Sequence, residues 1–207
     1  MRRYFIAAAL LAAVLGFSPA RAAERTLLVV GDSLSAEYGL PRGSGWVALL
    51  EQRLAQEKRN VRVVNASISG DTTFGGRSRL AALLAQHRPA VVVIELGGND
   101  ALRGLALDAT RANLEWMSQQ SKQAGARVLL LGMQMPPNYG ADYARRFAGL
   151  YTQVARSEKA ALVPFFLKGV ADGPDPTRLF QSDRIHPSAE AQPLMLNNVW
   201  PELKKLL

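Results

Sequence analysis

Mainly apolar runs alternate with polar segments along this chain, and five of the runs have the length of β-strands. They cover residues 26–30, 61–65, 90–96, 127–131 and 161–164. Their aliphatic and β-branched content predicts buried strands. The run at 90–96 is the most β-branched, so we expect it at the centre of a parallel sheet with helices on both faces. Pro164 cannot donate to a ladder, which predicts an edge position for the last strand.

Between these runs, apolar residues recur at the three-to-four residue spacing of amphipathic helices. The predicted helices lie at 44–58, around 80–84, at 107–123 and around 143–154. Residues 188–207 are helical in composition, and two prolines predict that this helix is kinked or begins late. Residues 168–187 are rich in glycine, proline and aspartate and predict a loop, and loops of this length are usually functional.

The regular alternation of strand and helix predicts the fold class. Strands that are each followed by a helix form a parallel sheet with right-handed connections. We therefore expect an α/β protein, a three-layer α/β/α sandwich around a five-stranded sheet of order 2-1-3-4-5. Such sheets bind ligands at the carboxyl ends of their strands, where loops and helix N-termini form a crevice.

The first residues have the organisation of an export signal. Arg2 and Arg3 precede an apolar stretch at 4–17, and the small-x-small tripeptide of a cleavage site follows at 20–22. We interpret residues 1–22 as a signal peptide and residues 23–207 as one domain, which predicts a periplasmic or secreted protein. The alternative is an uncleaved membrane anchor, for which the apolar stretch is short.

Composition limits the chemistry that this chain can perform. The 207 residues include no cysteine, which excludes disulfides, thiolate nucleophiles and cysteine-ligated zinc. Removal of the three arginines within residues 1–22 lowers the formal charge from +8 to +5. The remaining basic residues are scattered, which does not support nucleic-acid binding, whereas the charge permits weak contact with an anionic membrane surface. We expect a monomer.

Ser33 is the first candidate for chemistry, because it directly follows the first strand in the sequence Gly31-Asp32-Ser33. At the carboxyl edge of the sheet, its hydroxyl would be available as a nucleophile. The alternative is structural, since aspartate and serine often cap the helix that follows a strand.

A serine nucleophile needs a base, and the chain has only two histidines. His87 lies at a predicted helix end, where a histidine more often contacts terminal carbonyls. His186 lies in the long loop, three residues after Asp183. At that spacing in a turn, the carboxylate can orient the imidazole and stabilise its charged form, although the same pair also occurs as a surface feature.

An acyl-transfer intermediate also needs donors for its oxyanion. Gly70 follows the second strand and can present its backbone N–H without an obstructing Cβ. Asn99 follows the third strand and can donate from its side-chain amide. Each is alone typical of a turn, but together with Ser33 and His186 they indicate nucleophilic catalysis.

These motifs resemble, in order and context, the four sequence blocks of the SGNH (GDSL) hydrolases. The blocks are Gly31-Asp32-Ser33-Leu34-Ser35, Gly70 within residues 65–71, Gly97-Gly98-Asn99-Asp100 and Asp183-Arg184-Ile185-His186-Pro187. The match covers essentially the whole chain after residue 22. The chain is most similar to the bacterial periplasmic group of acyl-CoA thioesterases, lysophospholipases and arylesterases, also at residues 95–104 and 137–140.

The resemblance implies a flavodoxin-like fold and a serine esterase that acts on carboxylic esters and also on acyl thioesters or lysophospholipids. It implies Ser33 as nucleophile, His186 as base and Asp183 as its partner. The implied oxyanion hole consists of the Ser33 N–H, Gly70 and Asn99. The mechanism requires no metal and no cofactor.

One position departs from the family pattern, because Arg184 stands where glycine is common. A positive φ there would cost arginine about 1–2 kcal/mol. A cation beside the triad would also disfavour a positive charge on the imidazole.

The acyl group of a substrate is expected against apolar residues on neighbouring loops. The candidates are Leu102, Met135, Pro136 and Tyr139, with Met133 as either a further contact or an ordinary core residue. The family resemblance also implies that residues 101–104 move as a lid.

Two other functions stay open at this stage. One is a deacetylase or acetyltransferase on envelope polysaccharide, for which the rim offers Tyr139, Tyr38 and Phe74. The other is a non-catalytic periplasmic module that binds a carboxylate or phosphate at helix N-termini.

Overall fold

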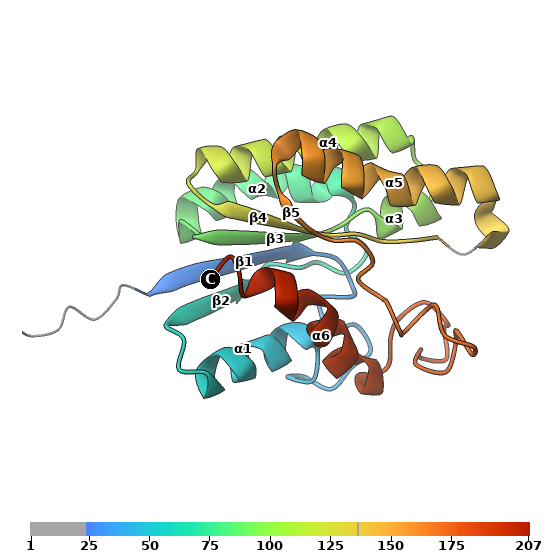
Figure 1. The fold of residues 1–207 in the computed structure, drawn as a ribbon, viewed down its shortest axis with the longest axis horizontal. Coiled ribbons are helices and arrows are strands. Elements are labelled where there is room, and N and C mark those ends of the chain that lie inside the picture. The colour runs from blue at the N-terminus through green and yellow to red at the C-terminus, as the bar shows by residue number, and fades with distance from the viewer. Residues whose placement is uncertain (1–23, 136) are drawn as a thin grey trace, which may run out of the picture.

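A computed structural model describes residues 24–135 and 137–207 of the chain (Figure 1). The expected signal peptide and the candidate Pro136 lie outside these residues. Five parallel strands form one sheet in the order β2-β1-β3-β4-β5, which confirms the predicted topology. The strands are β1 (Arg25–Gly31), β2 (Val61–Asn65), β3 (Val91–Glu95), β4 (Arg127–Leu131) and β5 (Ala161–Val163).

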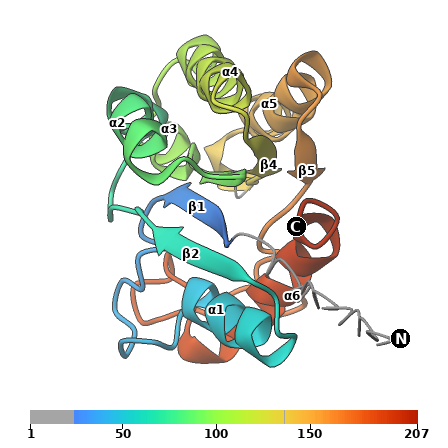
Figure 2. The same ribbon diagram turned by 90° about the vertical axis from the view of Figure 1, so that its left-hand side faces the viewer.

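Helices cover both faces of the sheet, as the three-layer prediction requires. They are α1 (Trp46–Gln56), α2 (Thr73–His87), α3 (Gly98–Leu102), α4 (Leu107–Gln123), α5 (Ala141–Glu158) and α6 (Gln192–Leu203), with 3₁₀ turns at Pro137–Tyr139 and Ala189–Ala191. Figure 2 shows α2, α4 and α5 on one face and α1 with α6 on the other. Each of these helices within the described residues is too short or too polar to cross a membrane.

The last helix begins late, as its prolines predict. Pro193 lies in the first turn of α6, where the N–H that proline lacks would have no helical partner. Pro201 lies close to the other end of the same helix. The short helix α3, directly after β3, was not predicted, because its five residues show no helical repeat.

The core surrounds the central strand β3 and its neighbour β1. Every residue of β3 is buried, and Leu27–Val30 of β1 are fully buried as well. Burial of one such aliphatic side chain contributes about 1.5–3 kcal/mol relative to exposure. The parallel register pairs Gly31 at the end of β1 with Glu95 at the end of β3. The segments that follow the two strands therefore start side by side.

All five strands run in the same direction, from left to right in Figure 1, so their carboxyl ends meet at one edge. The loop at 168–187, orange in Figure 1, lies at that edge and contains no helix or strand. A single bridge between Phe180 and Pro187 closes it, so His186 sits within a constrained turn.

Asp100 ties three helices together behind this edge. Its buried carboxylate accepts hydrogen bonds from the Thr73 main-chain N–H at 2.9 Å, from the Thr73 hydroxyl and from the Thr110 hydroxyl at 3.2 Å. Thr73 opens α2, Asp100 lies in α3 and Thr110 lies in α4. One side chain thus fixes the start of α2 relative to the loops at the rim.

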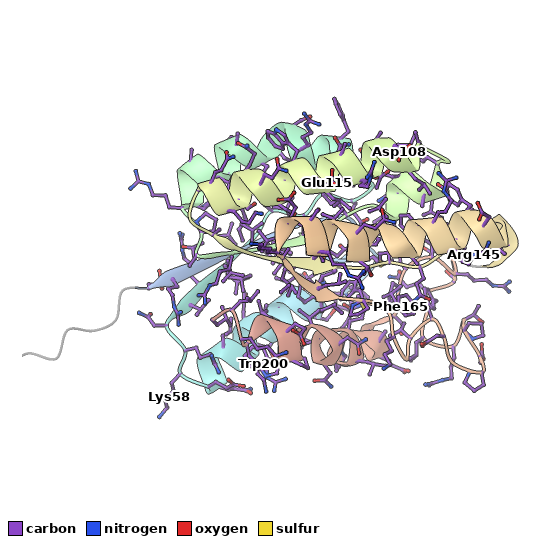
Figure 3. The ribbon with its side chains drawn as sticks, turned by 45° about the horizontal axis from the view of Figure 1, so that its top comes forward. Lys58, Asp108, Glu115, Arg145, Phe165 and Trp200 are labelled. Atoms are coloured by element: carbon purple, nitrogen blue, oxygen red, sulfur yellow. The ribbon has the colours of Figure 1, made fainter. Side chains whose placement is uncertain are left out.

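We predict that Asp100→Ala lowers the free energy of unfolding by about 2–3 kcal/mol, because it leaves the buried N–H and the buried hydroxyl of Thr73 without their acceptor. Asp108→Ala is the matched control, since Asp108, labelled in Figure 3, is 84% exposed and pairs only loosely with Arg111 at 3.5 Å. Its loss should cost less than about 1 kcal/mol. Urea denaturation measures both values, and equal losses would contradict the anchoring role of Asp100.

Candidate active site

The structure brings together three side chains that are far apart in the sequence. The Ser33 Oγ lies 2.9 Å from the His186 Nε2, and the His186 Nδ1 lies 2.6 Å from the Asp183 Oδ2. Ser33 does not cap the next helix, because the N-cap of α1 is Gly45 and no side chain bonds to it. The hydroxyl is therefore free to exchange a proton with the imidazole.

Asp183 is held by the turn that carries the histidine. Its Oδ1 accepts the main-chain N–H groups of Ile185 at 2.9 Å and His186 at 3.0 Å. The His186 main-chain N–H, together with the imidazole, holds the pKa of Asp183 at about 2. An ionised Asp183 only accepts hydrogen bonds, so we assign the ring hydrogen to Nδ1 and leave the Nε2 lone pair facing Ser33.

Two residues outside the four sequence motifs, Tyr38 and Gln181, hold the imidazole in place. The Tyr38 ring stacks on the His186 ring at a tilt of 36°, with 4.3 Å between the centroids. Gln181 donates its side-chain amide to the Tyr38 carbonyl at 2.9 Å and the Pro187 carbonyl at 3.2 Å. Gln181 thereby joins the loop after β1 to the histidine loop. Sequence spacing gives no signal for it, since the contact spans 143 residues.

Gly70 lies at the rim and has a backbone that favours glycine. Its φ of +77° is in the left-handed region, and its carbonyl accepts a hydrogen bond from the Arg103 guanidinium at 2.8 Å. The main-chain N–H groups of Gly70 and Ser33 have no acceptor among the described residues. Both are thus available to a ligand oxygen.

The Gly70 loop is clamped by a cation that sequence reasoning did not single out. Arg79 lies on α2, and its Nε and Nη2 reach Asp71 at 3.0 and 2.8 Å. It also donates to the Ala66 carbonyl. Two groups on one loop, the Asp71 carboxylate and the Ala66 carbonyl, therefore share one guanidinium, which limits the movement of Gly70.

Asn99 reaches the same rim from the first turn of α3, but its amide is already engaged. The Nδ2 atom lies 3.0 Å from the Asp32 Oδ2 and 2.9 Å from the Asp71 carbonyl. The structure thus places Asn99 between the segments that carry Ser33 and Gly70. It also gives Asp32 a contact that the motif alone does not reveal.

Asp32 and Glu95 form a buried pair of carboxyl groups behind Ser33. Asp32 is 3% exposed and Glu95 is fully buried. Burial raises the pKa of Asp32 to about 6, and burial together with the neighbouring Asp32 raises the pKa of Glu95 well above its ordinary value. The site therefore holds two carboxyl groups that disfavour simultaneous ionisation.

The candidate substrate contacts divide into two groups. Leu102 and Tyr139 are exposed at the rim, by 42% and 41%. Met135 and Met133 are buried in the hydrophobic core, so neither presents much surface to a ligand in this structure. The expected lid at 101–104 includes the end of α3 and the turn after it.

No group of three or more histidine, cysteine or carboxylate side chains within the described residues is placed to hold a metal ion.

A hydroxyl, an imidazole and a carboxylate that contact one another in this order, at the carboxyl edge of a parallel α/β sheet, define the class of serine hydrolases. Comparison with known proteins gives the family. The model of the GDSL-like lipase/acylhydrolase family matches residues 29–193, and the chain belongs to that family. It is therefore a hydrolase.

Similar proteins extend this result over most of the chain. The chain is 58% identical to "Esterase TesA" of Pseudomonas aeruginosa, over 90% of this chain and 92% of the relative. It is 42% identical to "Thioesterase 1/protease 1/lysophospholipase L1" of Escherichia coli K12, over 90% of this chain and 86% of the relative. It also resembles the crystal structure of the psychrotrophic esterase EstA from Pseudoalteromonas sp. inhibited by monoethylphosphonate, with 40% identity, a TM-score of 0.81, and coverage of 87% of this chain and 97% of that one.

Arg184 adopts the strained backbone that its replacement of glycine predicts, with a φ of +57°. We predict that Arg184→Gly raises the free energy of unfolding by about 1 kcal/mol, because glycine tolerates this conformation. Arg178→Gly is the control on the same loop, since Arg178 is not among the residues with positive φ. It should not stabilise the protein in the same urea titration. A destabilised Arg184→Gly would show that arginine contacts outweigh the backbone strain.

Proposed function

We propose that this protein is a serine esterase that works through an acyl-enzyme on Ser33, with His186 as base and Asp183 as its orienting partner. The observation that carries the proposal is the continuous path from the Ser33 Oγ to the His186 Nε2 at 2.9 Å and from the His186 Nδ1 to Asp183 at 2.6 Å. A hydrogen bond from nucleophile to base is the geometry that activates a serine.

The reaction has two halves that use the same groups. The Ser33 Oγ bonds to the ester carbonyl carbon while its proton moves to the His186 Nε2, and the carbonyl oxygen becomes an oxyanion. His186 then gives the proton to the leaving alcohol or thiol, which departs. Water repeats the attack on the acyl-enzyme and releases the acid. Asp183 stays ionised throughout and stabilises the imidazolium.

The oxyanion is held by the main-chain N–H groups of Ser33 and Gly70, which are unpaired among the described residues. The third donor is the Asn99 Nδ2, which shares its hydrogens with Asp32 and Asp71 before substrate binds. Removal of one such donor typically lowers kcat by about 10²–10³-fold.

Carboxylic esters are the primary substrates in this proposal, and acyl thioesters and lysophospholipids are further ones. The name of the Escherichia coli relative supports the two further classes. The export signal expected in residues 1–22 supports a periplasmic or secreted enzyme with one domain at 23–207. In that location lysophospholipids and exogenous esters are more accessible than acyl-CoA.

The rim itself supports contact with lipid. All the large hydrophobic side chains that are exposed within the described residues lie on segments at the carboxyl edge of the sheet. They form the apolar rim: Tyr38, Ile68, Phe74, Leu102, Leu105, Tyr139 and Ile185. Exposed Arg42, Arg103 and Arg184 lie on the same segments, which suits an anionic lipid surface. Docking by this face would present Ser33 to esters held in a membrane or micelle.

We predict that Phe74→Ser and Arg42→Glu each weaken binding to phosphatidylglycerol vesicles, measured by sedimentation. The charge reversal should lower the affinity roughly fivefold or more, because each basic residue contributes about 1 kcal/mol. Hydrolysis of a soluble p-nitrophenyl ester should be unchanged. Lys58→Glu makes the same charge change beyond the end of α1, far from the loop at 168–187 in Figure 3, and should weaken binding less. Equal effects of the two reversals would show that net charge, and not the apolar rim, governs binding.

The central prediction concerns Ser33. Ser33→Ala should lower kcat for p-nitrophenyl esters by on the order of 10⁶-fold and abolish labelling by a fluorophosphonate probe. Ser44→Ala, on the same loop, should leave both unchanged. Labelling that survives Ser33→Ala would refute the nucleophile. A wild-type protein that binds the ester without turnover would favour the binding module, and turnover confined to acetylated polysaccharide would favour the deacetylase.

A further inference from the structure

Behind the nucleophile, the carboxyl group of Asp32 comes first and that of Glu95 lies next to it in space. Gly31 pairs with Glu95 across β1 and β3, and a Cβ on Gly31 would lie 2.8 Å from the Glu95 Oε2. The glycine before Asp32 thus leaves the space that the Glu95 carboxyl group fills. This close approach places a second carboxyl group against the segment that carries Ser33.

One carboxyl oxygen of Glu95 accepts two hydrogen bonds, and the other accepts none among the described residues. The Oε2 accepts the Ser35 hydroxyl at 2.8 Å and the Asp32 main-chain N–H at 3.3 Å. The Ser35 hydroxyl in turn accepts the Trp46 indole N–H at 3.1 Å, so its own hydrogen is committed to Glu95. The buried Oε1 has no hydrogen-bond partner among the described residues. A buried oxygen that accepts from no donor is explained if it carries a proton and itself donates to the neighbouring Asp32 carboxyl group.

No lysine or arginine within the described residues forms an ion pair with either carboxyl group. Asp32 faces Glu95 directly, and Tyr151 is the other titratable group whose charge interacts with Glu95. Arg79 reaches only as far as the Gly31 carbonyl, at 3.5 Å. His186 acts on Asp32 from the side of the nucleophile. Two ionised carboxylates in this dry setting would repel each other without a compensating cation.

Asp32 is the better site for the single negative charge. Its Oδ1 accepts the Leu34 main-chain N–H at 3.0 Å, and its Oδ2 accepts the Asn99 Nδ2 at 3.0 Å. Glu95 has no comparable partner for its Oε1, and burial disfavours its ionisation more strongly. A proton on Glu95 therefore leaves Asp32 as an acceptor with three donors.

We propose that Glu95 is a protonated carboxylic acid in the resting enzyme, that it donates through Oε1 to Asp32, and that the two act as positioning residues for the Asn99 amide. Asp32 then holds the Asn99 Nδ2 at the rim, where it joins the main-chain donors around the oxyanion. This role deepens the proposed function and rests on its oxyanion hole. Ionisation of Glu95 would place two negative charges in contact, and their repulsion would displace the Asp32 carboxylate that holds Asn99.

The first test locates the proton. Infrared difference spectra of the wild type against Glu95→Gln at pH 8 should show the carbonyl band of a protonated carboxylic acid in the wild type only. Glutamine keeps a donor toward Asp32 and an acceptor for Ser35, so Glu95→Gln should retain kcat within about threefold of the wild type. An ionised Glu95, with no such band, would overturn the proposal.

The second test asks whether Glu95 acts through Asn99. Glu95→Leu removes the donor and should lower kcat by about tenfold or more, with KM changed less than twofold. In an Asn99→Ala background the same substitution should have almost no further effect on kcat, because neighbours in one network are not additive. If Asn99→Ala is slow and Glu95→Leu adds its full effect, the relay is wrong. If Asn99→Ala is as fast as the wild type, the proposed oxyanion hole fails instead.

Discussion

The parallel register of β1 and β3 is the constraint on which the site depends. Because Gly31 pairs with Glu95, the segments that leave these strands begin as neighbours at one edge of the sheet. Ser33 follows β1 and Asn99 follows β3, so two groups separated by 66 positions are placed together by main-chain pairing alone. A slip of one residue would turn each side chain to the opposite face and dissolve this arrangement.

A change of register would expose the buried core, so the register is strongly fixed. Polar side chains then hold the loops that leave the strands. Asp100 holds the start of α2, Arg79 holds the Gly70 loop and Gln181 holds the histidine loop. These contacts bury polar groups, which is favourable only when each group has its partner. The same contacts therefore support both stability and function, because a loop that lost its anchor would no longer hold its functional group in position for the substrate.

Much of this was predictable from the sequence. Strand runs, helical spacing and the Asp183–His186 pair depend on local pattern. The positive φ at Arg184 follows instead from the family resemblance, because glycine is common at this position. The remaining parts depend on contacts between distant residues. The acceptors of Asn99, the Gln181 clamp and the Glu95 carboxyl group have no signature in spacing, because they arise only when loops meet. Met135, a candidate substrate contact by its position near the rim, is packed into the core in this structure, which its sequence position does not reveal.

The most direct test of the account is a crystal structure of this protein after reaction with an alkyl phosphonate. The account predicts phosphorus bonded to the Ser33 Oγ, and a phosphonyl oxygen within about 3 Å of the Ser33 and Gly70 N–H groups and of the Asn99 Nδ2. A phosphorus atom on another residue, or a phosphonyl oxygen that faces solvent away from these donors, would contradict it.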